Sequence, residues 1–168
     1  MATIRIPILQ SGTNPDTSGD VFFEPYSVKA TNDVWDRLVA VFNDTATRIG
    51  LHGGFTVPKN YVGSANIIVV WTTTATSGDV EWDVDYRAVG GDDTESLDQA
   101  GTQESVNQND TAPSAAHERM ETSIAVTDAN FTVDDEVEFT VFRDGTDAGD
   151  TIAAAVLVFN ILFEYADA

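Results

Sequence analysis

Clustered aspartates are the residues of this chain that are best suited to chemistry. They lie in two polar stretches, at residues 92–98 and 144–150. Hard cations such as Ca²⁺ are bound by several carboxylate and carbonyl oxygens, which makes Asp144, Asp147 and Asp150 candidate metal ligands. Neither stretch has the spacing or the twelfth-position glutamate of a helix–loop–helix calcium site, and aspartate is also common in turns. We therefore predict turn-forming aspartates and no resident cofactor, with a calcium site as the alternative.

Two pairs of carboxylates have a spacing that could serve glycoside hydrolysis. Asp83 and Asp85 are separated by one residue, as are Glu136 and Glu138, so each pair shares one face of an extended strand. A glycosidase needs two carboxylates that flank the scissile bond. Both pairs, however, lie opposite the apolar residues of their strands, on the face that water covers. We predict that the protein is not an enzyme.

Histidines and tryptophans are the remaining candidates for a functional site. His52 and His117 stand in no metal-ligand or nucleophile motif, and the chain has no cysteine. Trp71 and Trp82 belong to apolar or alternating runs, so we expect both in the core. Trp35 lies beside aspartates rather than in such a run. It is the candidate for stacking on a sugar ring, because aromatic rings present an apolar face with a defined geometry.

A strong excess of acidic residues limits the partners of this chain. Its 168 residues include 8 Lys+Arg and 28 Asp+Glu, which gives a formal net charge of −20. That charge repels phosphate backbones and anionic lipids, so we predict neither nucleic acid nor a membrane as a partner. No stretch resembles a signal peptide or reaches the length of a membrane span. With 42% hydrophobic residues, the chain is long enough for one globular domain with one core.

Hydrophobic alternation predicts a protein made of strands. In residues 80–88, Val80, Trp82 and Val84 alternate with acidic residues, as in a strand with one face in the core. Gly, Pro, Asn and Asp separate this run from similar ones, and no run shows convincing helical spacing. About nine or ten strands separated by turns are typical of an antiparallel sandwich, so we predict an all-β, jelly-roll-like β-sandwich. We expect its strands at residues 21–28, 34–42, 48–57, 65–73, 80–88, 103–106, 118–126, 136–143 and 152–165.

The N-terminal segment has a different pattern from the rest. Its apolar residues alternate with polar ones up to Pro7, which cannot donate a hydrogen bond to a central ladder. Residues 10–20 then have the composition of a loop. We predict that the alternating residues form an edge strand or an extended arm, that residues 1–20 are an arm and linker that can lie away from the core, and that residues 21–168 form the sandwich domain.

The last strand, residues 152–165, is apolar on both faces. Strict alternation places Leu157, Phe159 and Ile161 on one face and Val156, Val158 and Leu162 on the other. An apolar face that the chain itself does not cover would contact another subunit or partner. The predicted interface residues are Ile4, Ile6, Ile8, Val156, Val158 and Leu162.

Four segments together resemble a class of tailed-phage virion structural proteins. They are Phe55–Tyr61, Ile67–Thr72, Ser77–Trp82 with its Gly-Asp-Val-Glu-Trp order, and Phe142–Thr151 with its Arg-Asp and Gly-Asp-Thr. In that class a similar order marks a jelly-roll-like domain, found in capsid decoration (cement) proteins and at the ends of tail fibres. The likeness spans about residues 55–165, and residues 1–50 have no part in it.

This resemblance implies a function and partners that the residues alone do not. It implies a non-enzymatic decoration protein on the capsid surface of a virion, which binds the major capsid protein and itself, most often as a homotrimer. The alternative is a glycan- or receptor-binding β-sandwich module of a tail fibre. We carry both expectations forward.

Overall fold

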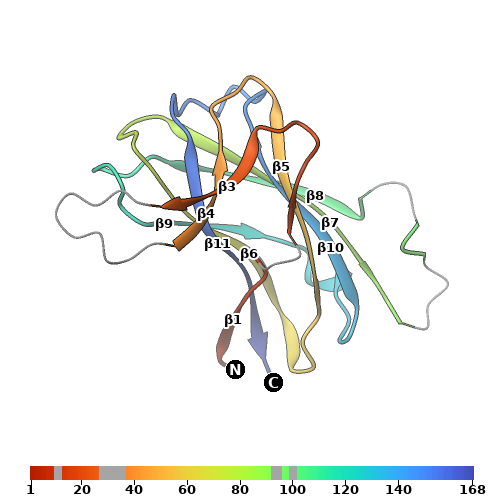
Figure 1. The fold of residues 1–168 in the computed structure, drawn as a ribbon. Coiled ribbons are helices and arrows are strands. Elements are labelled where there is room, and N and C mark those ends of the chain that lie inside the picture. Colours follow the sequence, from red (N-terminus) through yellow and green to blue (C-terminus); the bar gives the residue numbers. More distant parts are fainter. Residues whose placement is uncertain (10–12, 27–36, 92–95, 99–101) are drawn as a thin grey trace.

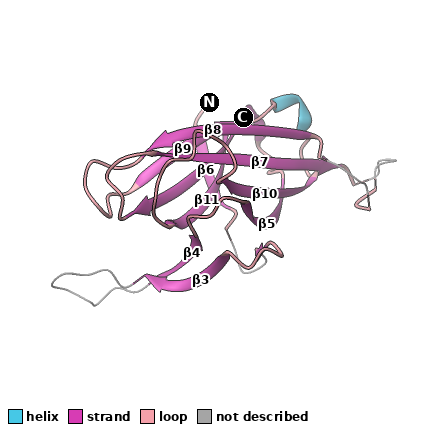
Figure 2. Ribbon diagram, turned by 90° about the horizontal axis from the view of Figure 1, so that it is seen from above, coloured by secondary structure: helices cyan, strands magenta, loops and turns pink. Residues whose placement is uncertain are grey.

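The computed structural model describes residues 1–9, 13–26, 37–91, 96–98 and 102–168. Over these residues the chain forms two packed antiparallel sheets and one 3₁₀ turn, η1, at Asp128–Asn130 (Figures 1 and 2). This confirms the predicted antiparallel β-sandwich. The strands are β1 Thr3–Pro7, β2 Asn14–Pro15, β3 Val21–Tyr26, β4 Arg37–Phe42, β5 Arg48–Thr56, β6 Tyr61–Thr73, β7 Asp79–Val89, β8 Glu104–Thr111, β9 Met120–Ala125, β10 Glu136–Asp144 and β11 Val156–Asp167.

The two sheets differ in size and in how their edges are made. The first has the strand order β3-β4-β11-β6-β9, and β1 also pairs with β11; the second has the order β2-β5-β10-β7-β8. The predicted short strand at 103–106 is longer than expected and forms the edge strand β8. No helix of the described residues has the length and apolar character that crossing a membrane requires.

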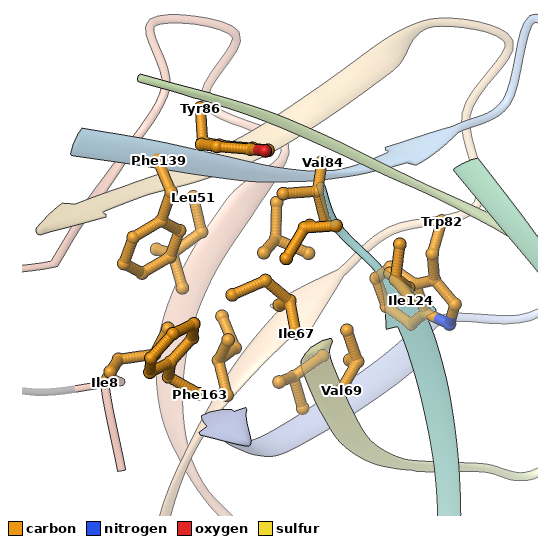
Figure 3. Close-up of a cluster of buried hydrophobic side chains, with 14 of the residues drawn as sticks. Ile8, Leu51, Ile67, Val69, Trp82, Val84, Tyr86, Ile124, Phe139 and Phe163 are labelled. Atoms are coloured by element: carbon orange, nitrogen blue, oxygen red, sulfur yellow. The ribbon is translucent and has the colours of Figure 1, made fainter. Parts of the chain in front are cut away.

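The hydrophobic core lies between the sheets and follows the predicted alternation. On β7, Val80, Trp82 and Val84 are 0% exposed, and Figure 3 shows Trp82 and Val84 in one cluster with Ile67 and Val69 of the opposite sheet. Each fully buried side chain of this size stabilises the fold by about 1.5–3 kcal/mol before the entropy of ordering is counted. The expectation that β7 has one face in the core is therefore confirmed.

Strand β11 is the centre of its sheet and pairs with three other strands. One edge pairs with β6 along most of its length. The other edge is shared, because β4 pairs with Val156–Val158 and β1 pairs with Leu162–Ala166. Between these two partners the ladder of the described residues is interrupted. There the backbone amides of Ile8 and Leu9 both donate to the Ile161 carbonyl, at 2.8 and 3.2 Å. The interruption leaves a gap in the sheet beside the middle of β11.

A β-bulge lies in that gap and changes which residues of β11 face the core. The register against β6 shifts between Val158 and Asn160, so Phe159 is an extra residue in the ladder. Val156 and Val158 face the core before the bulge, and Ile161 and Phe163 face it afterwards. The prediction of strict alternation over 152–165 is therefore wrong, because the bulge reverses the inward face within the strand.

The N-terminal segment is paired into both sheets, as the edge-strand alternative predicts, and does not form an arm that lies away from the core. β1 lies along β11, and β2 pairs with His52 and Leu51 of β5. Figure 1 shows the two chain ends side by side, where the Asp167 amide donates to the Ala2 carbonyl at 3.0 Å. Edge pairing of this kind satisfies backbone groups that water would otherwise have to satisfy.

The residues predicted for an interface are divided by this arrangement. Ile8, Val156 and Val158 are at most 1% exposed, so the structure assigns them to the core of the chain itself. Ile4, Ile6 and Leu162 keep partly exposed side chains. An interface through those three stays a prediction.

The two Gly-Asp turns noted in the sequence pack against each other. The Asp79 carbonyl accepts hydrogen bonds from the amides of Thr151 and Ile152, at 2.7 and 3.1 Å. Gly78 has a φ of +91°, and a Cβ there would lie 2.6 Å from the Thr151 carbonyl oxygen. Glycine is therefore required both by the backbone conformation and by the close approach of the second turn.

Candidate functional site

The gap beside β11 is a groove of about 560 Å³. Its floor is the bulge at Phe159 and Asn160, and one wall is the β3–β4 hairpin. The other wall comes from the N-terminal segment that follows β1. Figure 2 shows β3 beside β4, at the end of the first sheet. The groove is lined by Pro7, Leu9, Thr13, Phe23, Arg37, Leu38, Phe159 and Asn160.

Two phenylalanine rings and one exposed leucine give the groove its apolar surface. Phe23 and Phe159 are half-buried, and Leu38 is 61% exposed. An exposed apolar surface inside a concave site is a common feature of small-molecule sites, where a few polar groups fix the orientation of the ligand. Here those groups are Arg37 and Asn160.

An aromatic cluster fixes the Phe159 ring. The Tyr26 ring meets it edge to face, with 5.0 Å between the ring centroids, and the Tyr26 hydroxyl lies 3.2 Å from Nδ1 of His117. Burial raises the pKa of Tyr26, so its hydroxyl keeps its proton at neutral pH. The edge-to-face contact orders Phe159 before any ligand arrives, and a preordered ring loses little entropy on binding.

Arg37 lies at the rim of the groove with an exposed side chain. Its Nη2 donates to the Phe159 carbonyl at 3.1 Å, and its guanidinium carbon lies 5.2 Å from the centre of the Phe159 ring. The bulge makes this contact available, because a carbonyl in the interrupted part of the ladder has no strand partner on that side. The backbone of β11 thus holds the arginine over the ring.

A second depression, of about 350 Å³, lies on the outer face of the other sheet. It is polar, and its side chains bond to one another. Arg87 pairs with Glu138 at 2.6 Å, and Nδ1 of His52 lies 2.7 Å from the Thr140 hydroxyl. The residues around it are His52, Gly53, Asp85, Tyr86, Arg87, Thr102, Glu138, Phe139 and Thr140.

Arg48 links the acidic residues beside this second depression. Its Nε donates to Asp83 at 2.8 Å and its Nη1 to Asp85 at 2.9 Å, while the guanidinium lies 3.7 Å from the centre of the Phe142 ring. Gly50 makes room for that ring, since a Cβ at Gly50 would lie 2.5 Å from a Phe142 ring carbon. One face of the Phe142 ring is therefore already occupied within the chain.

The acidic residues of this face have shifted pKa values. Burial raises the pKa of Asp83, and the hydrogen bond from Arg48 only partly offsets it. For Asp85 burial acts in the same direction, but hydrogen bonds from Arg48 and Ser105 outweigh it and the pKa is lowered. Burial also raises the pKa of Glu81, against the hydrogen bond from Asn107. This face therefore carries closely spaced carboxylates, and Arg48 neutralises only part of their negative charge.

Comparison with known proteins identifies the fold. No known protein family matches this chain, and no curated protein matches it. Solved structures do. A CBM35 from Paenibacillus barcinonensis has a TM-score of 0.51 at 14% identity, over 97% of this chain and 98% of that one. A family 35 carbohydrate-binding module from Clostridium thermocellum has a TM-score of 0.50 at 11% identity, over 99% of both chains.

A third similar structure is the CBM22-1 xylan-binding domain of a Paenibacillus barcinonensis protein. Its TM-score is 0.50 at 11% identity, over 98% of this chain and 94% of that one. All three are carbohydrate-binding β-sandwiches, and at these identities the likeness shows the fold alone. The predicted jelly-roll-like sandwich is confirmed. None of the three is a virion protein, so the resemblance to phage proteins gains no support here.

The aspartates proposed as calcium ligands serve the loop in which they lie. Asp150 binds the buried Arg143 with both oxygens, at 2.8 and 2.7 Å. Asp144 accepts from Thr146, and Asp147 accepts from the Gly149 amide at 2.7 Å. No group of three His, Cys, Asp or Glu side chains in the described residues is arranged to hold a metal ion. Asp144 and Asp147 thus bond within their own turn, whereas Asp150 is the partner of a buried arginine. Calcium binding by this loop stays a prediction.

Two of the three tryptophans lie in the described residues. Trp71 and Trp82 are 0% exposed, which confirms their place in the core. Trp35, the candidate for sugar stacking, lies outside the described residues. The groove residues Arg37 and Phe159 were not found from the sequence. The signal that could have found them is Asn160, a polar residue inside the apolar run from Val156 to Phe163.

Proposed function

We propose that this protein is a non-catalytic carbohydrate-binding module whose ligand occupies the groove beside β11. The observation that carries the proposal is the lining of that groove. Two phenylalanine rings, one of them ordered by Tyr26, and an exposed leucine offer apolar surface, and Arg37 and Asn160 offer hydrogen-bonding groups around it. A sugar ring has apolar faces and polar edges, so it requires both kinds of contact at once.

The fold supports the same proposal. The three similar structures named above are carbohydrate-binding modules, and one of them is a xylan-binding domain. The superpositions include 97–99% of this chain, so the whole sandwich resembles these modules rather than a fragment of it. Xylan and other neutral β-linked polysaccharides are therefore the first ligands to test.

The groove residues favour a protein that binds sugar without hydrolysing it. Glycoside hydrolysis uses two carboxylates that flank the bond, and the described residues that line the groove include no carboxylate. The net charge of −20 does not oppose a neutral sugar, since the charge repels only anions at long range. Location on a virion, a homotrimer and contact with a major capsid protein stay predictions.

A pair of neighbouring phenylalanines provides a matched test. Phe23 lines the groove, whereas Phe22 points to the opposite side of β3 and is 39% exposed. We expect Phe23→Leu to weaken oligosaccharide binding about tenfold, because an aromatic contact contributes about 0.5–1.5 kcal/mol beyond its area. Phe22→Leu should leave the affinity unchanged. Calorimetric titration with xylo-oligosaccharides and mixed-linkage glucan oligosaccharides would measure both.

The outcome against the proposal is equally concrete. If the intact protein binds none of a broad panel of neutral and charged oligosaccharides, the carbohydrate-binding function is wrong. If it binds them and both leucine variants bind equally well, the ligand lies elsewhere and the groove is not its site.

A further inference from the structure

We propose that His117 is a positioning residue of the groove, which holds the Tyr26 ring so that Phe159 is fixed before a ligand binds. This inference rests on the proposed function and gives a role in that site to a residue that does not line it. His117 is half-buried and lies in the connection between β8 and β9, a part of the chain that contributes no lining residue to the groove.

The backbone of His117 has a conformation that disfavours any side chain. Its φ is +69°. The residue is the third of a β-turn, which the Glu118 amide closes by donating to the Ala115 carbonyl at 3.3 Å. A positive φ at this position of a turn normally calls for glycine or asparagine, and other L-residues adopt it only with backbone strain. His117 therefore lowers the stability of its own turn.

The turn that carries His117 is anchored to β6. The His117 amide donates to the Thr73 carbonyl at 2.9 Å, and the Thr72 hydroxyl donates to the Glu118 carbonyl at 2.6 Å. The Glu118 carboxylate also accepts a hydrogen bond from the Ala115 amide at 3.0 Å. None of these bonds uses the imidazole of His117, so the turn does not depend on that ring for its conformation.

The imidazole instead contacts Tyr26 at the end of β3. Nδ1 of His117 lies 3.2 Å from the Tyr26 hydroxyl, and the two rings meet edge to face with 6.1 Å between their centroids. Tyr26 in turn meets the Phe159 ring edge to face at 5.0 Å. The hydrogen bond fixes the far end of the Tyr26 ring, so this ring cannot move away from Phe159 without breaking that bond.

Tyr26 also shares its face of the hairpin with Arg37. The two residues are register partners in the pairing of β3 with β4, and directly opposite residues of an antiparallel pair lie on the same face. Arg37 lies over the Phe159 ring and donates to its carbonyl at 3.1 Å. Loss of the His117 contact would therefore loosen the surroundings of Phe159 and Arg37 together, and both residues line the groove.

A positioning role and a purely structural role predict different results when His117 is replaced by glycine. Glycine adopts a positive φ without strain, but it has no ring to contact Tyr26. If His117 serves the groove, the variant stays stable and its site becomes weaker, because a ligand must then order Phe159 on binding. If His117 serves only the fold, the variant loses stability and keeps its affinity.

The first test compares two substitutions of His117. We expect His117→Gly to keep its melting temperature within about 2 °C of the wild type or to exceed it. Its affinity for xylo-oligosaccharides or mixed-linkage glucan oligosaccharides should fall about fivefold, as one side chain that must be ordered on binding predicts. His117→Asn tolerates a positive φ and has a polar δ atom where His117 has Nδ1, so its affinity should stay within about twofold of the wild type.

The second test removes the other partner of the hydrogen bond. Tyr26→Phe keeps the ring and loses the hydroxyl, so we expect the same loss of about fivefold. The double variant with His117→Gly should bind no more weakly than either single variant, because both changes act through one contact. Ser64→Gly is the control, since Ser64 also has a positive φ, of +57°, and does not line the groove. Its affinity should be unchanged. Calorimetric titration and thermal unfolding measure every variant.

Four results would overturn the inference. If His117→Gly binds as tightly as the wild type while Phe23→Leu binds more weakly, the groove remains the site and His117 has no part in it. If the losses of His117→Gly and Tyr26→Phe add in the double variant, the two residues act separately. A lower melting temperature in His117→Gly together with no recovery in His117→Asn would assign His117 to the fold alone. If the wild type binds neither class of oligosaccharide, the proposed function itself is in doubt, and the inference falls with it.

Discussion

The two concave regions of this sandwich use charge in opposite ways. On the outer face of the sheet β2-β5-β10-β7-β8, Arg48 and Arg87 are each bonded to carboxylates of the same face. In the groove beside β11, Arg37 is bonded to a backbone carbonyl and lies over an aromatic ring. A ligand at the first region would have to break existing ion pairs, whereas a ligand at the second would form new hydrogen bonds.

This contrast shows why a polar depression is not by itself a binding site. The groups around the smaller depression satisfy one another, so they stabilise the sheet and gain little from a ligand. The groove exists because two strands share one edge of β11 and leave a bulge between them. The irregular part of the ladder, rather than the regular face, presents Arg37 and Asn160 to a ligand.

The largest expected effect on stability is at Arg143, which lies on β10 of the sheet β2-β5-β10-β7-β8. It is 1% exposed, and its carboxylate partner Asp150 is 3% exposed. It also donates to the carbonyls of Ala154 and Ile152, so it holds the loop that leads into β11. We expect Arg143→Met to lower the free energy of unfolding by about 3–5 kcal/mol, because it leaves a buried carboxylate without its charged partner. Urea unfolding followed by tryptophan fluorescence would measure it.

The same substitution at Arg37 gives the comparison. Arg37→Met should change the free energy of unfolding by less than about 0.5 kcal/mol, since the side chain is exposed and removes no ion pair of the described residues. Losses of equal size at the two positions would contradict the division of the arginines into structural and ligand-binding ones.

The sequence predicts the regular parts of this molecule well and the groove poorly, for one physical reason. The alternation of β7 and the Gly-Asp turn at Gly78 are local patterns, and the structure confirms the strand and its core face. The bulge at Phe159 depends on where two distant strands end along β11, which no local pattern records. That Arg37 has no acidic partner among the described residues likewise follows from the fold and from no local pattern.

Arg143 shows the same limit of sequence-based prediction for a buried residue. The alternation of β10 places it among the inward residues, together with Phe139 and Val141. Its residue type argues against that position, because arginine is almost never fully buried unless it is paired. Only the fold brings Asp150 and two carbonyls around it. The Arg-Asp and Gly-Asp-Thr pattern that suggested a phage protein is thus explained by the packing of this loop.

Arg48 should give an intermediate and pH-dependent effect. We expect Arg48→Met to lower the free energy of unfolding by about 1–2 kcal/mol at pH 7, between the values for exposed and buried pairs, because its side chain is 32% exposed. Without Arg48, burial would raise the pKa of both Asp83 and Asp85.

The sign of the pH dependence follows from those shifts. In the wild type the lowered pKa of Asp85 contributes stability that is present above its unfolded pKa of about 3.9 and is lost as the pH falls through the folded value. In the variant that contribution is absent, so the two proteins should differ most at pH 7 and least near pH 3. Unfolding curves at both pH values check this, and a difference that grows toward low pH would contradict the role of Arg48.

Glu81 should respond in the opposite direction. Burial and the nearby carboxylates of Asp147 and Asp83 raise its pKa, so its charge costs stability at neutral pH. A raised folded pKa gives stability that is present below the unfolded pKa of about 4.3 and is lost as the pH rises through the folded value. We expect Glu81→Gln to stabilise the protein at pH 7 by less than about 1 kcal/mol, and the gain should vanish below pH 4. A gain of the same size at both pH values would show that the charge is not its source.

The smallest expected effect is that of a substitution at His52, and it tests the contrast between the two concave regions directly. His52 lines the polar depression and bonds to Thr140 at 2.7 Å. We expect His52→Ala to cost about 0.5–1 kcal/mol of stability for the lost hydrogen bond and to leave oligosaccharide affinity within twofold of the wild type. If His52→Ala weakens binding tenfold while Phe23→Leu does not, the sugar binds at the polar depression on the outer face of the sheet β2-β5-β10-β7-β8. The ligand would then have displaced existing hydrogen bonds rather than used free ones.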